Sequence, residues 1–346
     1  MLITVVIPVY NVERYLRECL DSLCAQTFAD WEAVCVDDGS TDGSGAILEE
    51  YARRDRRIRV IRQANGGPGV ARDAALPLAR GDWIGFLDAD DWVGPDWLQQ
   101  AADELVARPV DLVRCGFRHQ FGDRRIVKRR RTRPFDLSGA DEVMRWGWTT
   151  WWKEAMVWRC FYRREMILSA GVSFGTGSVL EDMFFNLNLL PHVRSVRQIG
   201  SDGYVYRQRD GSLIHGGRDF VGTERILLDG LKVYESQRRR LSELGLVSAA
   251  FRQVFAVVWG NVGMWLWTHP RDEAKLRGEV RRLARRVLEP GANDRFPACA
   301  APVRRAIAGG LALLAASGAA HAVCRGAYAL AWNARDAVRR LKRGAR

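Results

Sequence analysis

Residues 83–92 read WIGFLDADDW, an apolar run that ends abruptly in carboxylates. A short apolar run rich in aromatic and β-branched residues indicates a buried strand. Asp88, Asp90 and Asp91 follow it directly, and carboxylates this close together repel one another unless a positive group lies between them. Hard oxygen ligands of this kind suit Mg²⁺ or Mn²⁺ that is shared with the phosphates of a substrate. The stretch therefore predicts a strand whose end binds a divalent cation.

Further strand-like runs lie on both sides of this stretch, at 3–10, 32–38, 58–63 and 110–117. Helical patterns separate them, and strands that alternate with helices at this pace predict a parallel, doubly wound α/β sheet. In such a sheet, ligands bind beyond the carboxyl ends of the strands. The chemically distinctive residues fall at those ends, in 8–11, 37–40 and 88–91.

Several residues predict where the helices begin and end. Asn11 precedes a helical pattern that contains Leu16 and Leu20, so we expect Asn11 to cap that helix. Pro77 is expected to end or kink the helix over 69–80, and Pro95 suits the first turn of a helix. Asp91 or Asp96 is a candidate cap for that last helix.

Two other segments carry ligand chemistry. In VDDGSTDGS (36–44) an apolar strand again ends in acids, and Asp38 has the chemistry to accept hydrogen bonds from a base or from ribose hydroxyls. The Gly-rich segment NGGPGVARDAA (65–75) lacks the Gly-Lys-Ser/Thr end of a P-loop. Because no GxGxxG follows the first strand, a nicotinamide-binding fold is not expected.

Four motifs in order carry a resemblance to a known family. VVIPVYNVERYLRECLDSLCAQTF (5–28), VCVDDGSTDGS (34–44), NGGPGVARDAAL (65–76) and WIGFLDADDW (83–92) closely resemble the N-terminal half of family 2 glycosyltransferases. The resemblance implies the GT-A nucleotide-diphospho-sugar transferase fold, a Rossmann-like mixed sheet flanked by helices. It also implies a UDP-sugar donor.

The resemblance assigns a role to each matching residue. Asp38 matches the residue that reads the uracil ring, and Arg72 matches an Arg near the nucleotide. Asp90 matches the direct metal ligand, and Asp88 lies nearer the ribose and sugar. The segment lining the nucleotide pocket is matched by Pro8, Tyr10 and Glu13. The common NGGVSAARNAG pattern is broken here at Pro68, Gly69, Asp73 and Ala75, which leaves the shape of this loop open.

A second set of motifs resembles the acceptor side of the family. VWRCFYRREMI (157–167) and GVSFGTGSVLEDMFF (171–185) lead to an acidic pair, at which inverting members place the catalytic base. The resemblance makes Asp182 the base and Glu181 its alternative, while the other interpretation is charge that complements a helix N-terminus. In YVYRQRDGSLIH (204–215), Arg207 would face the diphosphate and His215 would complete the metal shell.

Charge divides the chain into two unequal parts. The first 100 residues have a net charge of −7, whereas 101–346 have a net charge of +19. A basic second part indicates an anionic partner, such as nucleic acid, anionic lipid or a phosphorylated glycan. We expect a catalytic domain over 1–215, with a nucleotide-sugar half (1–117) and an acceptor half (118–215), followed by a helical, basic C-terminal region over 216–346.

The C-terminal region suggests contact with a membrane. Residues 306–324 carry no charge, and their Ala and Gly content favours a buried or interfacial hairpin over a spanning helix. Residues 326–343 form a basic amphipathic pattern that suits either an anionic membrane surface or a packed helix. The N-terminal MLITVVIPVY has no features of a signal peptide. Seven cysteines without a CxxC pair indicate reduced, mostly buried thiols in a cytosolic protein.

The family resemblance, together with the charge and the C-terminal pattern, implies an inverting, metal-dependent hexosyl- or N-acetylhexosaminyltransferase on the inner face of the cytoplasmic membrane. It would act on a glycan or lipid-linked acceptor in the assembly of lipopolysaccharide, capsule or exopolysaccharide. One alternative is a nucleic-acid-binding protein, but no zinc-finger spacing or aromatic-basic RNA-binding pattern supports it, and no nucleic acid is expected. Another is a nucleotidyltransferase, which needs a Gly-rich activation loop that the segment after the first strand lacks. The tryptophans at 146, 148, 151, 152 and 158 suit either core packing or a platform for sugar rings.

Overall fold

The computed structural model describes residues 1–107, 109–121, 133–150, 156–175, 180–208, 233, 236–237 and 239–246, together with the backbone of 124–130. The chain divides into two compact units, Met1–Ser212 and Leu213–Arg346. The predicted metal ligand His215 and the segments 306–324 and 326–343 lie outside the described residues. The domain boundary after residue 215 stays a prediction.

The first unit is built on an eight-stranded sheet in the order β3-β2-β1-β4-β10-β6-β11-β9. Strands β1, β2, β3 and β4 are parallel neighbours. Their buried apolar residues form the centre of the core. The strands of this sheet are β1 (Ile3–Val9), β2 (Trp31–Asp37), β3 (Ile58–Arg62), β4 (Trp83–Phe86), β6 (Leu112–Arg114), β9 (Phe135–Ser138), β10 (Cys160–Arg163) and β11 (Ser195–Gln198).

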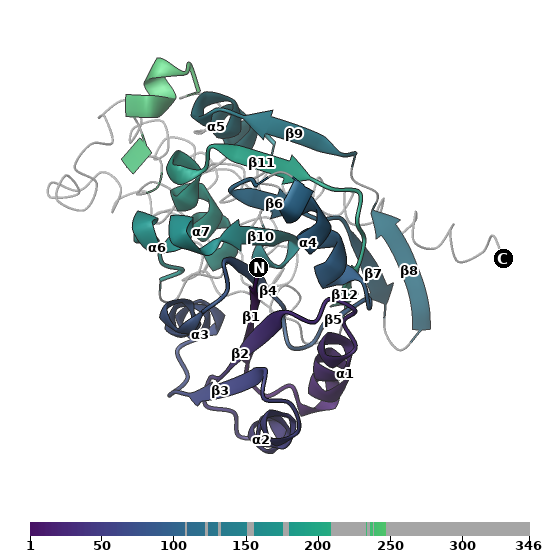
Figure 1. Ribbon diagram of the computed structural model, residues 1–346. Helices are drawn as coiled ribbons and strands as arrows, with labels where there is room; N and C mark the ends of the chain where they lie inside the picture. The colour runs from purple at the N-terminus through teal and green to yellow at the C-terminus, as the bar shows by residue number, and fades with distance from the viewer. Residues whose placement is uncertain are drawn as a thin grey trace, which may run out of the picture. The chain divides into compact units, whose positions relative to one another are not determined.

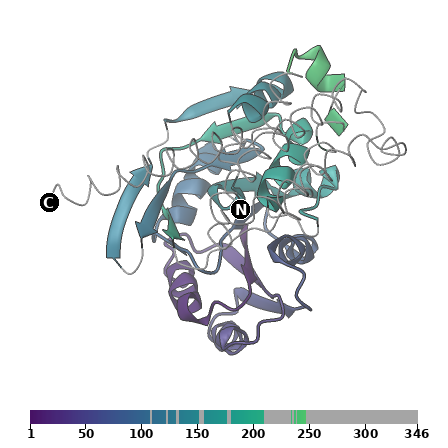
Figure 2. The ribbon, with the colours of Figure 1, turned by 180° about the vertical axis from the view of Figure 1, so that it is seen from behind.

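Helices cover both faces of this sheet. α1 and α3 lie on opposite sides of β1 and β2 in both views (Figure 1, Figure 2). The helices are α1 (Glu13–Cys24), α2 (Ser44–Arg54), α3 (Pro68–Ala75), α4 (Trp97–Ala107), α5 (Ala140–Thr149), α6 (Arg164–Ala170) and α7 (Glu181–Leu189). Short 3-10 turns are η1 (Leu76–Leu78), η3 (Val157–Arg159) and η4 (Leu190–His192).

A second, four-stranded sheet has the order β5-β12-β7-β8. Its strands are β5 (Trp92–Val93), β7 (Phe117–Phe121), β8 (Arg124–Arg130) and β12 (Tyr204–Gln208). β7 and β8 pair antiparallel. Because β5 follows the acidic turn directly and pairs with β12, this small sheet ties residues after 200 to the end of β4.

The sequence-based expectations meet the structure with two corrections. The sheet is mixed, because β10 runs antiparallel between β4 and β6 and β9 runs antiparallel at the edge. This confirms the mixed sheet that the family resemblance implies and corrects the parallel sheet that strand–helix alternation alone predicts. Asn11 does not cap α1, whose N-cap is Val12. Asn11 has a positive φ of 49°, and its side chain accepts a hydrogen bond from the backbone N–H of Thr41 instead. Pro77 does end α3, which passes into η1.

Most of the described aromatic and thiol side chains are packed inside. Trp148 and Trp158 are 0% and 4% exposed, which confirms core packing for these two tryptophans. The cysteines of the described part are free thiols, four of them buried and Cys24 half-buried. No helix among the described residues is long and apolar enough to cross a membrane.

Candidate active site

The carboxyl ends of β1, β2 and β4 meet at one edge of the large sheet, because these strands are parallel neighbours. The turn 87–91 continues β4 there: the backbone N–H of Leu87 bonds to the Val6 carbonyl and that of Asp91 to the Asp88 carbonyl. The acidic residues noted in the sequence therefore lie at the edge where a sheet of this kind binds its ligands.

The three acids of the turn have different surroundings. Asp91 is 1% exposed and accepts hydrogen bonds from the Tyr204 hydroxyl and the Arg207 backbone N–H, both at 2.7 Å. Burial, with the nearby Asp90 and Asp88, raises the pKa of Asp91 well above its ordinary value. Asp91 thus joins the turn to β12 and does not cap α4, which begins at Trp97.

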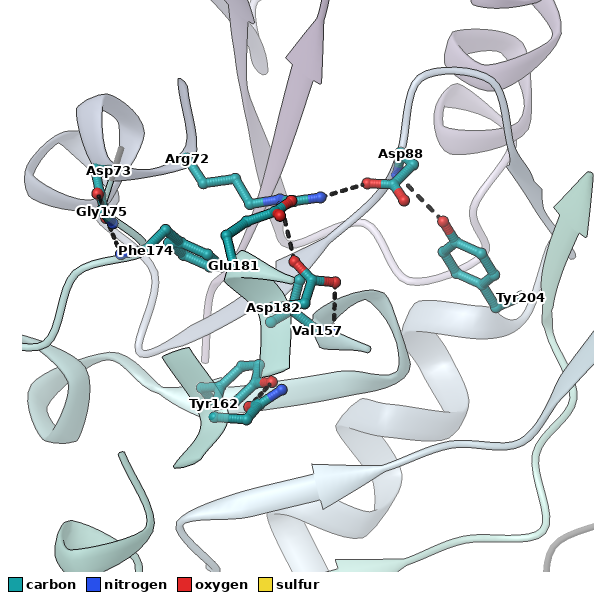
Figure 3. A network of polar contacts seen from close by, with 11 residues as sticks. Arg72, Asp73, Asp88, Val157, Tyr162, Phe174, Gly175, Glu181, Asp182 and Tyr204 are labelled. Carbon is teal, nitrogen blue, oxygen red and sulfur yellow. Dashed lines mark hydrogen bonds and ion pairs between the residues drawn. The ribbon is translucent and has the colours of Figure 1, made fainter. Parts of the chain in front are cut away.

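The positive group beside Asp88 in this structure is Arg72, from α3. Its guanidinium contacts Asp88 at 2.8 Å, Glu181 at 3.0 Å and Asp182 at 2.8 Å. Figure 3 shows the guanidinium lying between the turn after β4 and the start of α7. Burial lowers the pKa of Arg72, but the three carboxylates raise it by more, so the side chain is a fixed cation. The side chain is only 4% exposed, so little solvent screens these contacts.

Asp182 has the electrostatic character of a proton acceptor. One carboxylate oxygen meets Arg72, and the other accepts a hydrogen bond from the Val157 backbone N–H at 3.2 Å. Burial raises its pKa to about 7; the Arg72 guanidinium opposes this shift, and Glu181 and Asp88 add to it. A carboxyl group poised near neutral pH matches the requirement of a general base.

Asp38 and its neighbours shape the adjoining loop. Asp38 is 2% exposed, and its two oxygens accept hydrogen bonds from Gln63 and from the backbone N–H groups of Gly66 and Gly67, at 2.7–2.9 Å. The carboxylate therefore holds the Gly-rich segment that leads into α3.

Of the residues matched to the nucleotide pocket, Pro8 lies in β1 beside Val36, and Tyr10 is 48% exposed at the end of that strand. Glu13 accepts a hydrogen bond from the backbone N–H of Gly43, which joins α1 to the loop after β2.

Arg207 is buried and engaged with the chain itself. Its guanidinium donates to the Asp90 carbonyl at 2.9 Å, pairs with Glu18 and lies 5.1 Å from the centre of the Tyr15 ring. The side chain therefore joins β12 to α1 and to the acidic turn. A contact between Arg207 and a diphosphate stays a prediction.

The donor atoms at the strand end fit a divalent cation that shares its shell with a phosphate. The described residues contain no group of three or more His, Cys, Asp or Glu side chains arranged to hold a metal. Asp88 and Asp90 nevertheless place hard oxygen donors at the end of β4, and Mg²⁺ or Mn²⁺ commonly takes one or two carboxylates and fills its remaining positions with water and substrate phosphates.

Several supporting residues were not singled out from the sequence. The Tyr204 hydroxyl bonds to both Asp91 and the Asp88 backbone N–H, and the Tyr162 hydroxyl donates to Asn186 at 2.7 Å, one turn beyond Asp182. Tyr204 lies in a segment already compared with the family, but no spacing rule links it to Asp91. These contacts join residues more than 20 positions apart.

Comparison with known proteins places the chain in a family. The sequence model for glycosyl transferase family 2 matches residues 4–170. Two Bacillus subtilis (strain 168) proteins described as glycosyltransferases are similar to it. EpsJ is 40% identical over 223 residues, which cover 61% of this chain and 62% of EpsJ. EpsH is 33% identical over 256 residues, which cover 70% of this chain and 69% of EpsH.

The fold is found in solved structures as well. The structure of Staphylococcus aureus TarS 1–349 in complex with UDP-GlcNAc has a TM-score of 0.63 at 18% identity, covering 95% of this chain and 91% of that one. The chain therefore has the GT-A fold. It belongs to glycosyltransferase family 2.

Proposed function

We propose that the protein transfers a hexose or N-acetylhexosamine from a UDP-sugar to a glycan or lipid-linked acceptor, with inversion at the anomeric carbon. The observation that carries this proposal is the meeting of Asp88 and Asp182 on one arginine, Arg72. Asp88 lies at the strand end where the donor would bind, and Asp182 is the carboxylate that would activate the acceptor. Only the Arg72 side chain separates the two. TarS, whose fold this chain shares, was solved with UDP-GlcNAc.

The reaction must remove a proton from the acceptor and stabilise the negative charge on the departing diphosphate. Asp182 takes the proton from the acceptor hydroxyl as its oxygen attacks the anomeric carbon. The bond from that carbon to the diphosphate breaks on the opposite side, so the configuration inverts and UDP leaves. Mg²⁺ or Mn²⁺ held by Asp90 and Asp88 would supply charge that stabilises the departing diphosphate. Glu181 is the alternative base.

Nucleotide recognition is assigned to the edge formed by β1, β2 and the loop into α3. Pro8, Tyr10 and Glu13 would line the pocket, and Asp38 would read the uracil ring. Asp38 also holds the Gly66–Gly67 backbone, so its loss is expected to disturb the loop as well as the base contact.

The proposed setting is the assembly of a surface polysaccharide at the inner face of the cytoplasmic membrane, with the basic region 216–346 as the contact. Its charge and the amphipathic pattern of 326–343 support this. Sedimentation of the full chain with anionic but not neutral vesicles is the expected result, and equal retention on both would contradict it.

One experiment tests the central proposal. Wild-type protein is incubated with a panel of UDP-, GDP- and dTDP-sugars, with and without Mn²⁺, and sugar release is measured. We expect release from a UDP-sugar that depends on the metal. Asp182→Asn should lower turnover by about 100-fold or more while UDP affinity stays within twofold. Release from only a GDP- or dTDP-sugar would overturn the donor assignment, and full turnover by Asp182→Asn would overturn the base assignment.

A further inference from the structure

Helix α3 contacts the site through two consecutive residues, and only the first has been accounted for. Arg72 contacts the three carboxylates described above. Asp73, the next residue, accepts hydrogen bonds from the backbone N–H of Phe174 at 2.8 Å and of Gly175 at 3.1 Å (Figure 3). A carboxylate that accepts two adjacent backbone N–H groups fixes both the position and the direction of the segment that carries them.

The anchored segment is packed against α7. The Phe174 ring stacks on Phe185 with ring centres 4.0 Å apart and planes 3° from parallel. Phe185 lies on α7, three residues beyond Asp182, so a displacement of Phe174 is transmitted to the helix that carries the proposed base. The Arg72 guanidinium carbon lies 5.4 Å from the centre of the same Phe174 ring.

The approach between α3 and this segment is close. A Cβ atom at Gly69 would lie 2.9 Å from the Gly175 carbonyl oxygen, 3.2 Å from the Phe174 Cβ and 3.3 Å from the Glu181 Cγ. Only a residue without a side chain leaves this space open. Gly69 and Asp73 are one turn apart on α3 and therefore face the same segment. Gly69 leaves room for the segment to approach the helix, and Asp73 holds the segment there by hydrogen bonds.

We propose that Asp73 is a positioning residue: its carboxylate anchors the Phe174–Gly175 segment on α3 and so sets where Asp182 meets Arg72. This rests on the proposed function, in which Asp182 is the base. Helix α3 carries both Arg72, which contacts the carboxylates, and Asp73, which holds the segment. It therefore fixes both partners of the contact between Arg72 and Asp182. Small displacements of a reacting group lower rates steeply. Asp38 holds the other end of α3, through the backbone of Gly66 and Gly67, and makes neither of the hydrogen bonds to Phe174 and Gly175.

The test compares kinetics of Asp73→Ala, Asp73→Asn and Gly69→Ala with wild type, using whichever nucleotide sugar the wild type turns over. We expect kcat to fall at least tenfold in Asp73→Ala, with the donor KM and the UDP affinity within twofold. Asp73→Asn should be intermediate, because its amide oxygen accepts one N–H while its NH₂ group cannot accept the other. Gly69→Ala should lower kcat although Asp73 is present.

Asp111 offers a matched control. Its carboxylate also accepts hydrogen bonds from two adjacent backbone N–H groups, those of Arg194 at 2.8 Å and Ser195 at 3.1 Å, although here one oxygen, Oδ2, accepts both. The same oxygen accepts a hydrogen bond from the Ser195 hydroxyl at 3.3 Å, and the other lies 3.5 Å from Arg163. Asp111 joins the start of β6 to β11 and contacts none of the site residues named above. Asp111→Ala, which removes these acceptors as Asp73→Ala does, should therefore lower the thermal midpoint while kcat stays within twofold.

Hydrogen exchange gives a readout that does not depend on turnover. The amides of Phe174 and Gly175 should exchange at least tenfold faster in Asp73→Ala, and those of Arg194 and Ser195 should not change. The proposal is overturned if these two amides exchange as in wild type, if folded Asp73→Ala keeps kcat within twofold, or if its donor KM and UDP affinity worsen as much as kcat.

Asp182→Asn in the same assay separates the two proposals. Loss of turnover in Asp73→Ala with full turnover in Asp182→Asn would refute the base assignment and leave the anchor in place. Loss in Asp182→Asn with none in Asp73→Ala would refute the anchor alone.

Discussion

Replacing Arg72 by Met removes the one cation that contacts Asp88, Glu181 and Asp182 among the described residues. The variant keeps a side chain of similar length but leaves three partly buried carboxylates without their ion pairs. Removing one partner of a buried pair costs about 3–5 kcal/mol. Because the three carboxylates retain 26%, 13% and 20% exposure, we expect the lower end of that range.

The loss can be expressed as a shift in thermal midpoint. For a unit of the size of Met1–Ser212, each kcal/mol lowers the midpoint by about 2–4 °C. A loss of about 3 kcal/mol therefore predicts a midpoint about 6–12 °C lower at pH 8. Thermal unfolding followed by circular dichroism measures this directly.

The same variant should show a pH signature. Arg72 lowers the pKa of Asp182 against the effect of burial, and it does the same for Asp88. Stabilisation of this kind is present above the carboxyl pKa values and is lost as the pH falls through them. With Asp182 at about 7 in the wild type, the difference in midpoint between wild type and Arg72→Met should shrink between pH 8 and pH 5.

Arg197→Met is the matched control. Arg197 also pairs with two carboxylates, Asp136 and Glu104, but these are 54% and 41% exposed and keep their hydration. Its loss should cost at most about 1 kcal/mol. The reasoning on Arg72 is refuted if Arg72→Met lowers the midpoint no more than this control, or if its deficit is the same at pH 8 and pH 5.

Three further predictions concern the proposed base, the support of the acidic turn, and the packing at the amino ends of β1 and β4. The rate of transfer should fall as the pH drops below about 7, because burial raises the pKa of Asp182 to about 7 and the base must be ionised; a flat profile of kcat/KM from pH 5.5 to 9 would contradict this. Tyr204→Phe should cost about 1–3 kcal/mol in denaturant unfolding, because it removes a hydrogen bond to buried Asp91; an unchanged midpoint would show that Asp91 finds another donor. Gly81→Ala should cost about 1–3 kcal/mol, since its Cβ would lie 2.6 Å from the Thr4 nitrogen, whereas Gly200→Ala, with 3.8 Å to Pro134, should be neutral; similar midpoints for both would argue against the steric explanation.

The sequence predicts the parallel half of the sheet well because the information there is local. Apolar runs identify β1, β2 and β4, and acids at the ends of β2 and β4 identify the edge where ligands bind. β10 was not predicted: it has four residues, and its place between β4 and β6 depends on pairing with strands about 50–80 positions away. A strand that short carries too little periodicity to be distinguished from the helical sequence around it.

The site shows the same limit. The acidic pair at 181–182 and Arg72 can be found from motifs, but their contact joins residues about 110 positions apart. Neither spacing nor composition specifies which carboxylate an arginine meets. Asn11 illustrates the reverse case, where a local rule predicted a helix cap and a contact with Thr41 from another loop prevailed.

The central position of β10 has a consequence for how the protein is made. β4 and β6 leave the ribosome well before Cys160–Arg163, yet β10 is the strand that joins them in the sheet. Until it emerges, each of the two strands exposes an unpaired edge toward the middle of the future sheet, and such edges favour aggregation. Nascent chains arrested before residue 160 should therefore depend on chaperones. Protease resistance should appear only in chains arrested beyond the length that frees residue 208, because β11 and β12 are still needed to complete the two sheets.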